Sequence, residues 1–289
     1  MTHPRQFPAL IVFASLVLLS APASPAAESP VDDLLRRAQE AFRNGDSTNA
    51  LALATKAVAA EPKSPRVWFF RGQLHDAFRQ HEKSAADFGE VIKLDPKSTG
   101  AWQQRGTAYF KLGKIKESIA DFDKVIELVP DQEPHHWQRG ICYYYAGRFE
   151  DGRKQFESHQ TVNQNDVENA VWHFLCVTRA AGVEKARAAL IPIKGDSRVP
   201  MAQVHDLFAG KAKPADVLAA AQAGDAPAAK RSPQLFYAHL YLGLYFEAIG
   251  DAKQARDYIF KAAAQAGDND YMGDVARVHA EILRKQEKK

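Results

Sequence analysis

Three side chains of metal-ligand type lie near one another in the middle of the chain. His173 and Cys176 are three residues apart and share one face of a predicted helix, and His159 belongs to the helix before it. The alternative is ordinary packing, because His173 and Cys176 stand where other copies of a recurring pattern have arginine and a small residue. We favour packing and predict no metal site.

Sequence motifs for catalysis are absent. The stretch from Gly106 to Lys114 ends in Gly-Lys, but six residues separate its glycines and no serine or threonine follows, so it is not a phosphate-binding loop. The chain contains no GxSxG, no HExxH and no glycine-rich dinucleotide loop. We therefore expect no enzymatic activity and no cofactor.

The stretch from Trp102 to Pro130 predicts a hairpin of two helices. Trp102, Gly106 and Tyr109 share one face of the first helix, Gly113 ends it, and Pro130 ends the second. Gly106 has no side chain, so the second helix can approach closely there. The apolar face of the second helix is formed by Ile115, Ile119, Phe122, Val125 and Ile126.

The same pattern recurs with a period of 34 residues. This period and these residue types resemble the tetratricopeptide repeat (TPR). The resemblance implies an all-α, right-handed solenoid of antiparallel helix hairpins with a C-terminal capping helix. The matching positions are Ala38, Gly45, Ala50, Ala54, Ala57 and Pro62, then Trp68, Gly72, Phe88 and Pro96, and then Trp137 (shifted by one), Gly140, Tyr143, Gly147 and Phe156.

The repeat frame divides the chain into six parts. After residue 166 the pattern weakens, and proline and glycine interrupt it between 192 and 233 before it returns at Phe236. We expect a signal peptide (1–26), four repeats within 27–166 (31–64, 65–98, 99–132 and 133–166), a divergent fifth repeat (167–191), an irregular segment with short helices (192–233), a TPR-like hairpin (234–268), and a capping helix with a basic tail (269–289).

The N-terminal residues are typical of a cleaved export signal. The apolar run from Ala9 to Ser20 is too short to span a bilayer comfortably, and small residues follow it, so we expect cleavage after Ala23 or Ala26. No cysteine follows the run, which excludes lipid attachment there. We predict an exported bacterial protein, periplasmic or secreted, with no membrane span after cleavage.

The charge balance points away from nucleic acid. Lysine and arginine number 38 against 35 acidic residues, so no large basic excess is present to bind phosphates. Export would permit a disulfide between Cys142 and Cys176. Equivalent positions of stacked repeats lie roughly 8 to 10 Å apart, beyond the reach of a disulfide, and we expect two buried thiols.

The first helix of each hairpin lines the concave face of a TPR solenoid, and its residues that are not needed for packing are candidates for a peptide-binding groove. The alternative is that segment 192–233 or a dimer partner buries these side chains. Lysine and asparagine are missing from the family's carboxylate-clamp positions, so we do not expect that binding mode. The candidates are Phe69, Gln73, Asp76, Gln103, Thr107, Phe110, Lys111, Trp137, Ile141, Tyr144 and Tyr145.

More narrowly, the layout resembles bacterial envelope repeat proteins of the NlpI type, with a late hairpin containing YLGLYFEAIGD, but without their lipid-attachment cysteine. Members of that group are non-enzymatic adaptors that dimerise. The resemblance implies a scaffold that binds protein or peptide partners of the cell envelope, with a homodimer as one possibility. The alternative is a structural or assembly protein whose repeats serve self-association or a fixed subunit contact.

Overall fold

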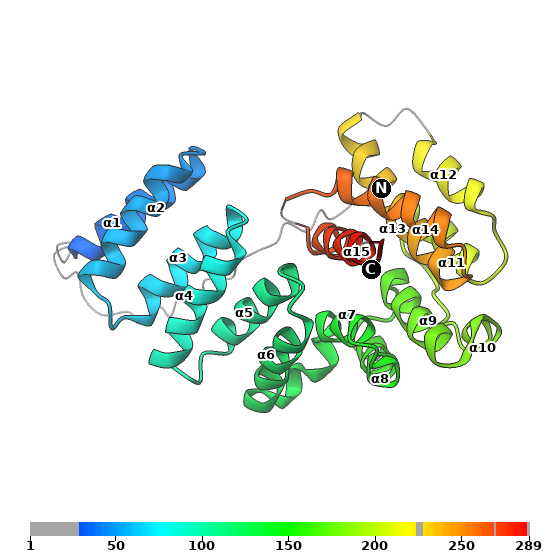
Figure 1. Cartoon of the computed structure of the whole chain (residues 1–289), viewed down its shortest axis with the longest axis horizontal. Coiled ribbons are helices and arrows are strands. Elements are labelled where there is room, and N and C mark those ends of the chain that lie inside the picture. The colour runs from blue at the N-terminus through cyan, green and yellow to red at the C-terminus, as the bar shows by residue number, and fades with distance from the viewer. Residues whose placement is uncertain (1–28, 224–227, 269, 288–289) are drawn as a thin grey trace, which may run out of the picture.

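The computed structural model describes residues 29–223, 228–268 and 270–287. The expected signal peptide lies outside these residues. Every regular element within them is a helix, and the helices form successive hairpins, which confirms the all-α solenoid. Figure 1 shows the first four hairpins as an arch and the later helices gathered at its far end.

The arch consists of the hairpins α1/α2, α3/α4, α5/α6 and α7/α8, and α9 packs against α8. These helices are α1 (Pro30–Arg43), α2 (Ser47–Ala60), α3 (Pro65–Ala77), α4 (His81–Leu94), α5 (Thr99–Lys111), α6 (Ile115–Leu128), α7 (Trp137–Tyr145), α8 (Phe149–Gln160) and α9 (Val167–Ala181).

The C-terminal part begins with short helices and ends with three longer ones, of which α13 and α14 form a further hairpin. A 3-10 helix, η1 (Pro130–His135), precedes α7. The remaining helices are α10 (Val183–Ala188), α11 (Met201–Phe208), α12 (Pro214–Gln222), α13 (Ala228–Ala248), α14 (Ala252–Gln265) and α15 (Tyr271–Glu287).

Glycine permits the close approach of the two helices in each hairpin. A Cβ atom at Gly106 would lie 2.7 Å from the ring of Phe122, and one at Gly140 would lie 2.7 Å from the ring of Phe156. Such contacts are too short for packed carbon atoms, so any larger residue would push the helices apart. Phe122 is fully buried and Phe156 is 1% exposed, so these rings fill the space that glycine leaves.

A buried ion pair also repeats within the hairpins. Arg71 donates two hydrogen bonds of 2.7 Å to Asp87, and Arg105 donates two of 2.8 Å to Asp121. Both pairs join the first helix of a hairpin to its second. Two parallel charge-assisted bonds fix the geometry of a guanidinium and a carboxylate, so the pairs set the register between the helices.

The tryptophans of the repeat anchor each first helix to the preceding turn. The indole nitrogens of Trp68 and Trp102 donate to the carbonyl oxygens of Pro62 and Pro96, each at 2.9 Å. The equivalent Trp137 is displaced by one residue, after η1, and packs differently.

The turn between the helices of a hairpin needs a left-handed residue. Gly45, Gly113 and Gly147 have φ between 69° and 76° there. At the equivalent place in the second hairpin stands Arg79, with φ of 57°, the one non-glycine residue of positive φ in the described ranges. A side chain in this conformation costs about 1 kcal/mol or more, so a compensating contact of Arg79 is expected.

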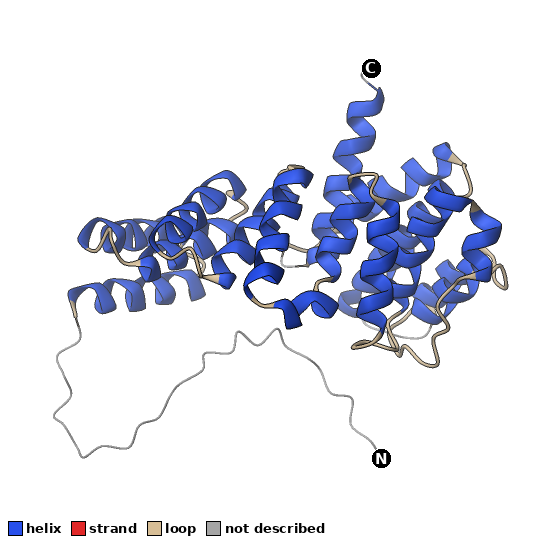
Figure 2. Ribbon diagram, turned by 90° about the horizontal axis from the view of Figure 1, so that it is seen from below, coloured by secondary structure: helices blue, strands red, loops and turns tan. Residues whose placement is uncertain are grey.

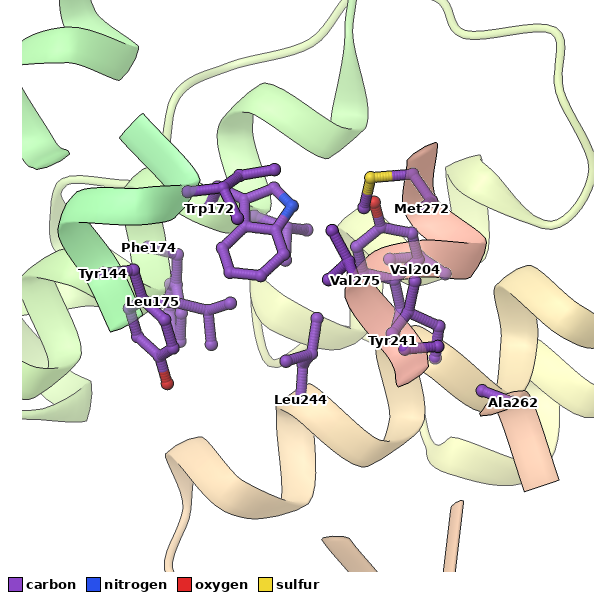
Figure 3. Packing of buried hydrophobic residues seen from close by; sticks show 14 of the residues in the cluster. Tyr144, Trp172, Phe174, Leu175, Val204, Tyr241, Leu244, Ala262, Met272 and Val275 are labelled. Carbon is purple, nitrogen blue, oxygen red and sulfur yellow. The ribbon is translucent and has the colours of Figure 1, made fainter. Parts of the chain in front are cut away.

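The last helix, α15, lies inside the arch, opposite α5 and α7, rather than only covering the end of the solenoid (Figure 1). Its C-terminal end projects away from the other helices in Figure 2. Because Met272, Val275 and Val278 are all buried, α15 forms part of the main core, together with residues of α9, α11 and α13 (Figure 3). In the middle of the concave face, α15 therefore covers Phe110 and Trp137, whereas the alternative expected segment 192–233 or a dimer partner there.

Candidate protein-binding surface

The aromatic part of the expected groove lies beneath α15. Phe110 is fully buried, and its ring stacks on that of Tyr271 at 5.2 Å between centroids. Trp137 contacts the same tyrosine edge-on at 4.9 Å. Ile141 is also fully buried. In this conformation Phe110 and Trp137 contact the protein's own C-terminal helix, and Ile141 belongs to the same hydrophobic cluster.

A chain of polar contacts joins α7, α13 and α15. The Tyr145 hydroxyl lies 3.1 Å from Nδ1 of His279, whose Nε2 lies 3.0 Å from Glu247. Glu247 also accepts a hydrogen bond of 3.4 Å from Tyr144. Burial raises the pKa of Glu247, but His279 and Arg179 more than offset that effect, and the pKa lies below its ordinary value. The carboxylate is therefore ionised and holds three helices together.

The acidic and basic candidates belong to an ion network that also reaches α15. Lys111 donates to Asp76 at 2.8 Å and lies 3.6 Å from Asp274, which is 3% exposed. Arg79 donates to Asp274 at 3.0 Å, the contact that accompanies its strained backbone. Burial raises the pKa of Asp76, but hydrogen bonds and charges of His81 and Lys111 lower it by more, so the pKa lies below its ordinary value.

Partly exposed glutamine side chains lie on the first helices of three consecutive hairpins. Gln103 donates to Gln138 at 3.0 Å, Thr107 donates to the Gln103 carbonyl at 3.0 Å, and Gln73 is partly exposed on the preceding repeat. Phe69 instead contacts Phe88 at 5.2 Å within the core. The amide groups of these glutamines can both donate and accept hydrogen bonds.

Sequence reasoning missed several residues of this face. Gln138 is the true equivalent of Gln103, and the one-residue displacement of Trp137 was the available signal. Tyr271, Asp274 and His279 gave no comparable signal, because their partners lie more than a hundred residues away.

The residues of metal-ligand type are used in packing. Nδ1 of His159 lies 2.8 Å from the Pro134 carbonyl oxygen, and Nε2 of His173 lies 3.3 Å from Glu157. Cys142 and Cys176 are free, buried thiols, and burial raises the pKa of Cys142 to about 12. Among the described residues, no group of three or more histidine, cysteine or acidic side chains could hold a metal ion. No described helix is long and apolar enough to cross a membrane.

Two family models described as tetratricopeptide repeat match the chain, at residues 35–101 and 100–132. No curated protein matches it at a significant level. Among solved structures, a tetratricopeptide repeat protein from Parabacteroides merdae ATCC 43184 has a TM-score of 0.57 at 14% identity, covering 88% of this chain and 98% of its own. A MamA fragment from Desulfovibrio magneticus RS-1 has a TM-score of 0.51 at 17% identity, covering 56% and 92%. At these identities the structures show a shared fold.

Proposed function

Because the chain is a tetratricopeptide repeat protein, we propose that it is a non-enzymatic scaffold of the bacterial cell envelope that binds a protein partner through the glutamine-bearing part of its concave face. The observation that carries this proposal is the glutamine row. Gln73, Gln103 and Gln138 are partly exposed on the first helices of three consecutive hairpins, and Gln103 donates to Gln138 across two of them.

The chemistry of this row suits an extended peptide. A peptide backbone offers alternating N–H and C=O groups, and each glutamine side chain has both a donor and an acceptor. The neighbouring Lys111 already pairs with Asp76 and Asp274, so its charge is not free to select a charged partner. We therefore propose recognition through backbone hydrogen bonds rather than through a terminal carboxylate.

The aromatic candidates were expected to contact a bound partner, but in the structure they pack against other helices of the same chain. Phe110, Trp137 and Tyr144 contact α15 or α13, so replacing them would disturb the fold as well as any groove. A test of binding needs residues that do not hold the helices together.

The test is capture from an envelope extract with the mature protein and with a Gln73→Ala, Gln103→Ala double variant. A matched control replaces Lys83 and Lys116, two exposed residues on the second helices of the same hairpins. We expect a partner that binds the wild type and the control and is lost from the glutamine variant. Equal binding to all three would refute the glutamine row, and a stable oligomer without other partners would favour the assembly function.

Export remains part of the proposal and rests on the apolar run from Ala9 to Ser20 with the small residues after it. The intact mass of the protein from its native host tests it. We expect a mass that begins after Ala23 or Ala26, and a full-length mass would contradict export by cleavage.

A further inference from the structure

A cavity of about 330 Å³ lies where α7, α9 and α15 meet. Trp137, Trp172 and Met272 contribute to its wall from these three helices. Its volume lies at the lower end of the range of small-molecule pockets. The cavity is therefore large enough for a small organic ligand.

Two buried polar groups at this cavity have no hydrogen-bond partner in the described structure. One is the indole N–H of Trp172, a side chain that is 1% exposed, and the other is Oδ1 of Asn169, which is 3% exposed. In Figure 3 the indole nitrogen of Trp172 lies on the side of the ring that faces Met272. The amide group of Asn169 is fixed by donation to the Phe156 carbonyl and to Gln160, each at 3.1 Å, so its oxygen is the free acceptor.

Leaving such groups unpaired is costly, on the order of 1 to 3 kcal/mol for each. A buried donor and a buried acceptor that line one cavity can be paired by a ligand that supplies the matching acceptor and donor.

The charges around the cavity favour a cation. The cavity is lined by Asp166, Glu168 and Asp270, and Arg198 is the one arginine or lysine among its lining residues. Arg198 pairs with Asp166 at 2.6 Å, with Glu168 at 2.5 Å and with Asp196, outside the lining, at 2.5 Å. Burial raises the pKa of Glu168 to about 7, against the lowering effect of Arg198, and burial also raises the pKa of Asp270. One guanidinium thus faces more carboxyl groups than it can neutralise.

Aromatic faces complete the surroundings. Trp137, Trp172, Tyr237 and Tyr271 line the cavity, and tryptophan and tyrosine rings attract organic cations. We propose that this cavity binds a small organic ammonium compound that also carries an oxygen acceptor. The ammonium group meets Asn169 Oδ1 and the carboxylates, and the oxygen accepts from the Trp172 indole.

The probes that test this are three sugars of similar size and different charge: glucosamine, glucose and glucuronate. The readout is the set of indole N–H resonances in a ¹H–¹⁵N spectrum of the full protein. Trp68 and Trp102 are internal controls, because their indoles donate to proline carbonyls away from the cavity. We expect glucosamine to shift the Trp137 and Trp172 signals, with glucose weaker and glucuronate without effect.

Two variants check the residues. Trp172→Phe keeps a ring and removes the donor, and Asp270→Asn keeps an acceptor and removes a charge. Each is expected to weaken glucosamine binding about tenfold, with the Trp68 and Trp102 signals unchanged as proof of folding. No shift of Trp137 and Trp172 with glucosamine, or equal shifts with all three sugars, would show a cavity that holds water only and would overturn the proposal.

Discussion

Arg79 has a strained backbone conformation and donates a hydrogen bond to α15, and replacing it separates the cost of the strain from the stabilisation by the hydrogen bond. Its left-handed conformation costs about 1 kcal/mol or more in any residue but glycine. Its hydrogen bond to buried Asp274 is charge-assisted, and such bonds contribute about 1.5 to 3 kcal/mol. Asp274 keeps Arg277 at 3.1 Å and Lys111 at 3.6 Å, so we take the lower end, about 1.5 kcal/mol.

The perturbation is Arg79→Gly, with Arg79→Ala as the matched control. Both variants lose the contact, so amide hydrogen exchange in α15 should become about tenfold faster in each. Only glycine relieves the strain, so the free energy of unfolding of Arg79→Gly should exceed that of Arg79→Ala by about 1 kcal/mol.

Hydrogen exchange followed by peptide mass spectrometry measures the first effect, and urea denaturation measures the second. Unchanged exchange in α15 for both variants would refute the contact. Equal stability of the glycine and alanine variants would refute the strain.

Three further predictions concern the hairpins and the buried groups. Gly106→Ala places a methyl group 2.7 Å from Phe122 and should lower the free energy of unfolding in urea by about 1 to 3 kcal/mol. At Gly89 a new methyl group meets nothing nearer than 3.7 Å, so Gly89→Ala should raise the free energy of unfolding by up to about 1 kcal/mol. Changes of the same sign in both variants would contradict the close approach at Gly106. Burial lowers the pKa of His136 to about 4, so its contribution is complete above pH 6.5 and is lost as the pH falls from 6.5 towards 4, on the order of 3 kcal/mol. His136→Phe should remove that part of the acid sensitivity in denaturation curves, and an unchanged pH dependence would argue against it. Cys142 should resist alkylation at neutral pH in the native protein and react in urea, as intact mass reports, because burial raises its pKa to about 12; rapid modification of the native protein would contradict its burial.

The repeat hairpins could be predicted from the sequence because local residues determine them. The close approach at Gly106, the left-handed turn at Gly113 and the indole bond of Trp102 each involve partners within about one hairpin. Each of these features also requires a particular residue type, so the pattern could be recognised at every period.

The occupied concave face could not be predicted in the same way. It depends on contacts such as that of Phe110 with Tyr271, between helices far apart in the chain. Asp274 and His279 are polar, and their burial makes sense only once Arg79 and Tyr145 are opposite them. The sequence left open whether these aromatic residues line an open groove or are buried by segment 192–233 or a dimer partner, whereas in the structure Phe110 and Trp137 contact α15.

The central claim is that α15 occupies the middle of the concave face. A double-mutant cycle with Phe110→Leu, Tyr271→Leu and the double variant, measured by urea denaturation, tests this claim most directly. Because the two rings stack at 5.2 Å between centroids, we expect a favourable coupling energy between Phe110 and Tyr271 of about 0.5 to 1.5 kcal/mol. Additive effects with no coupling would show that the two side chains do not touch and would contradict the placement of α15.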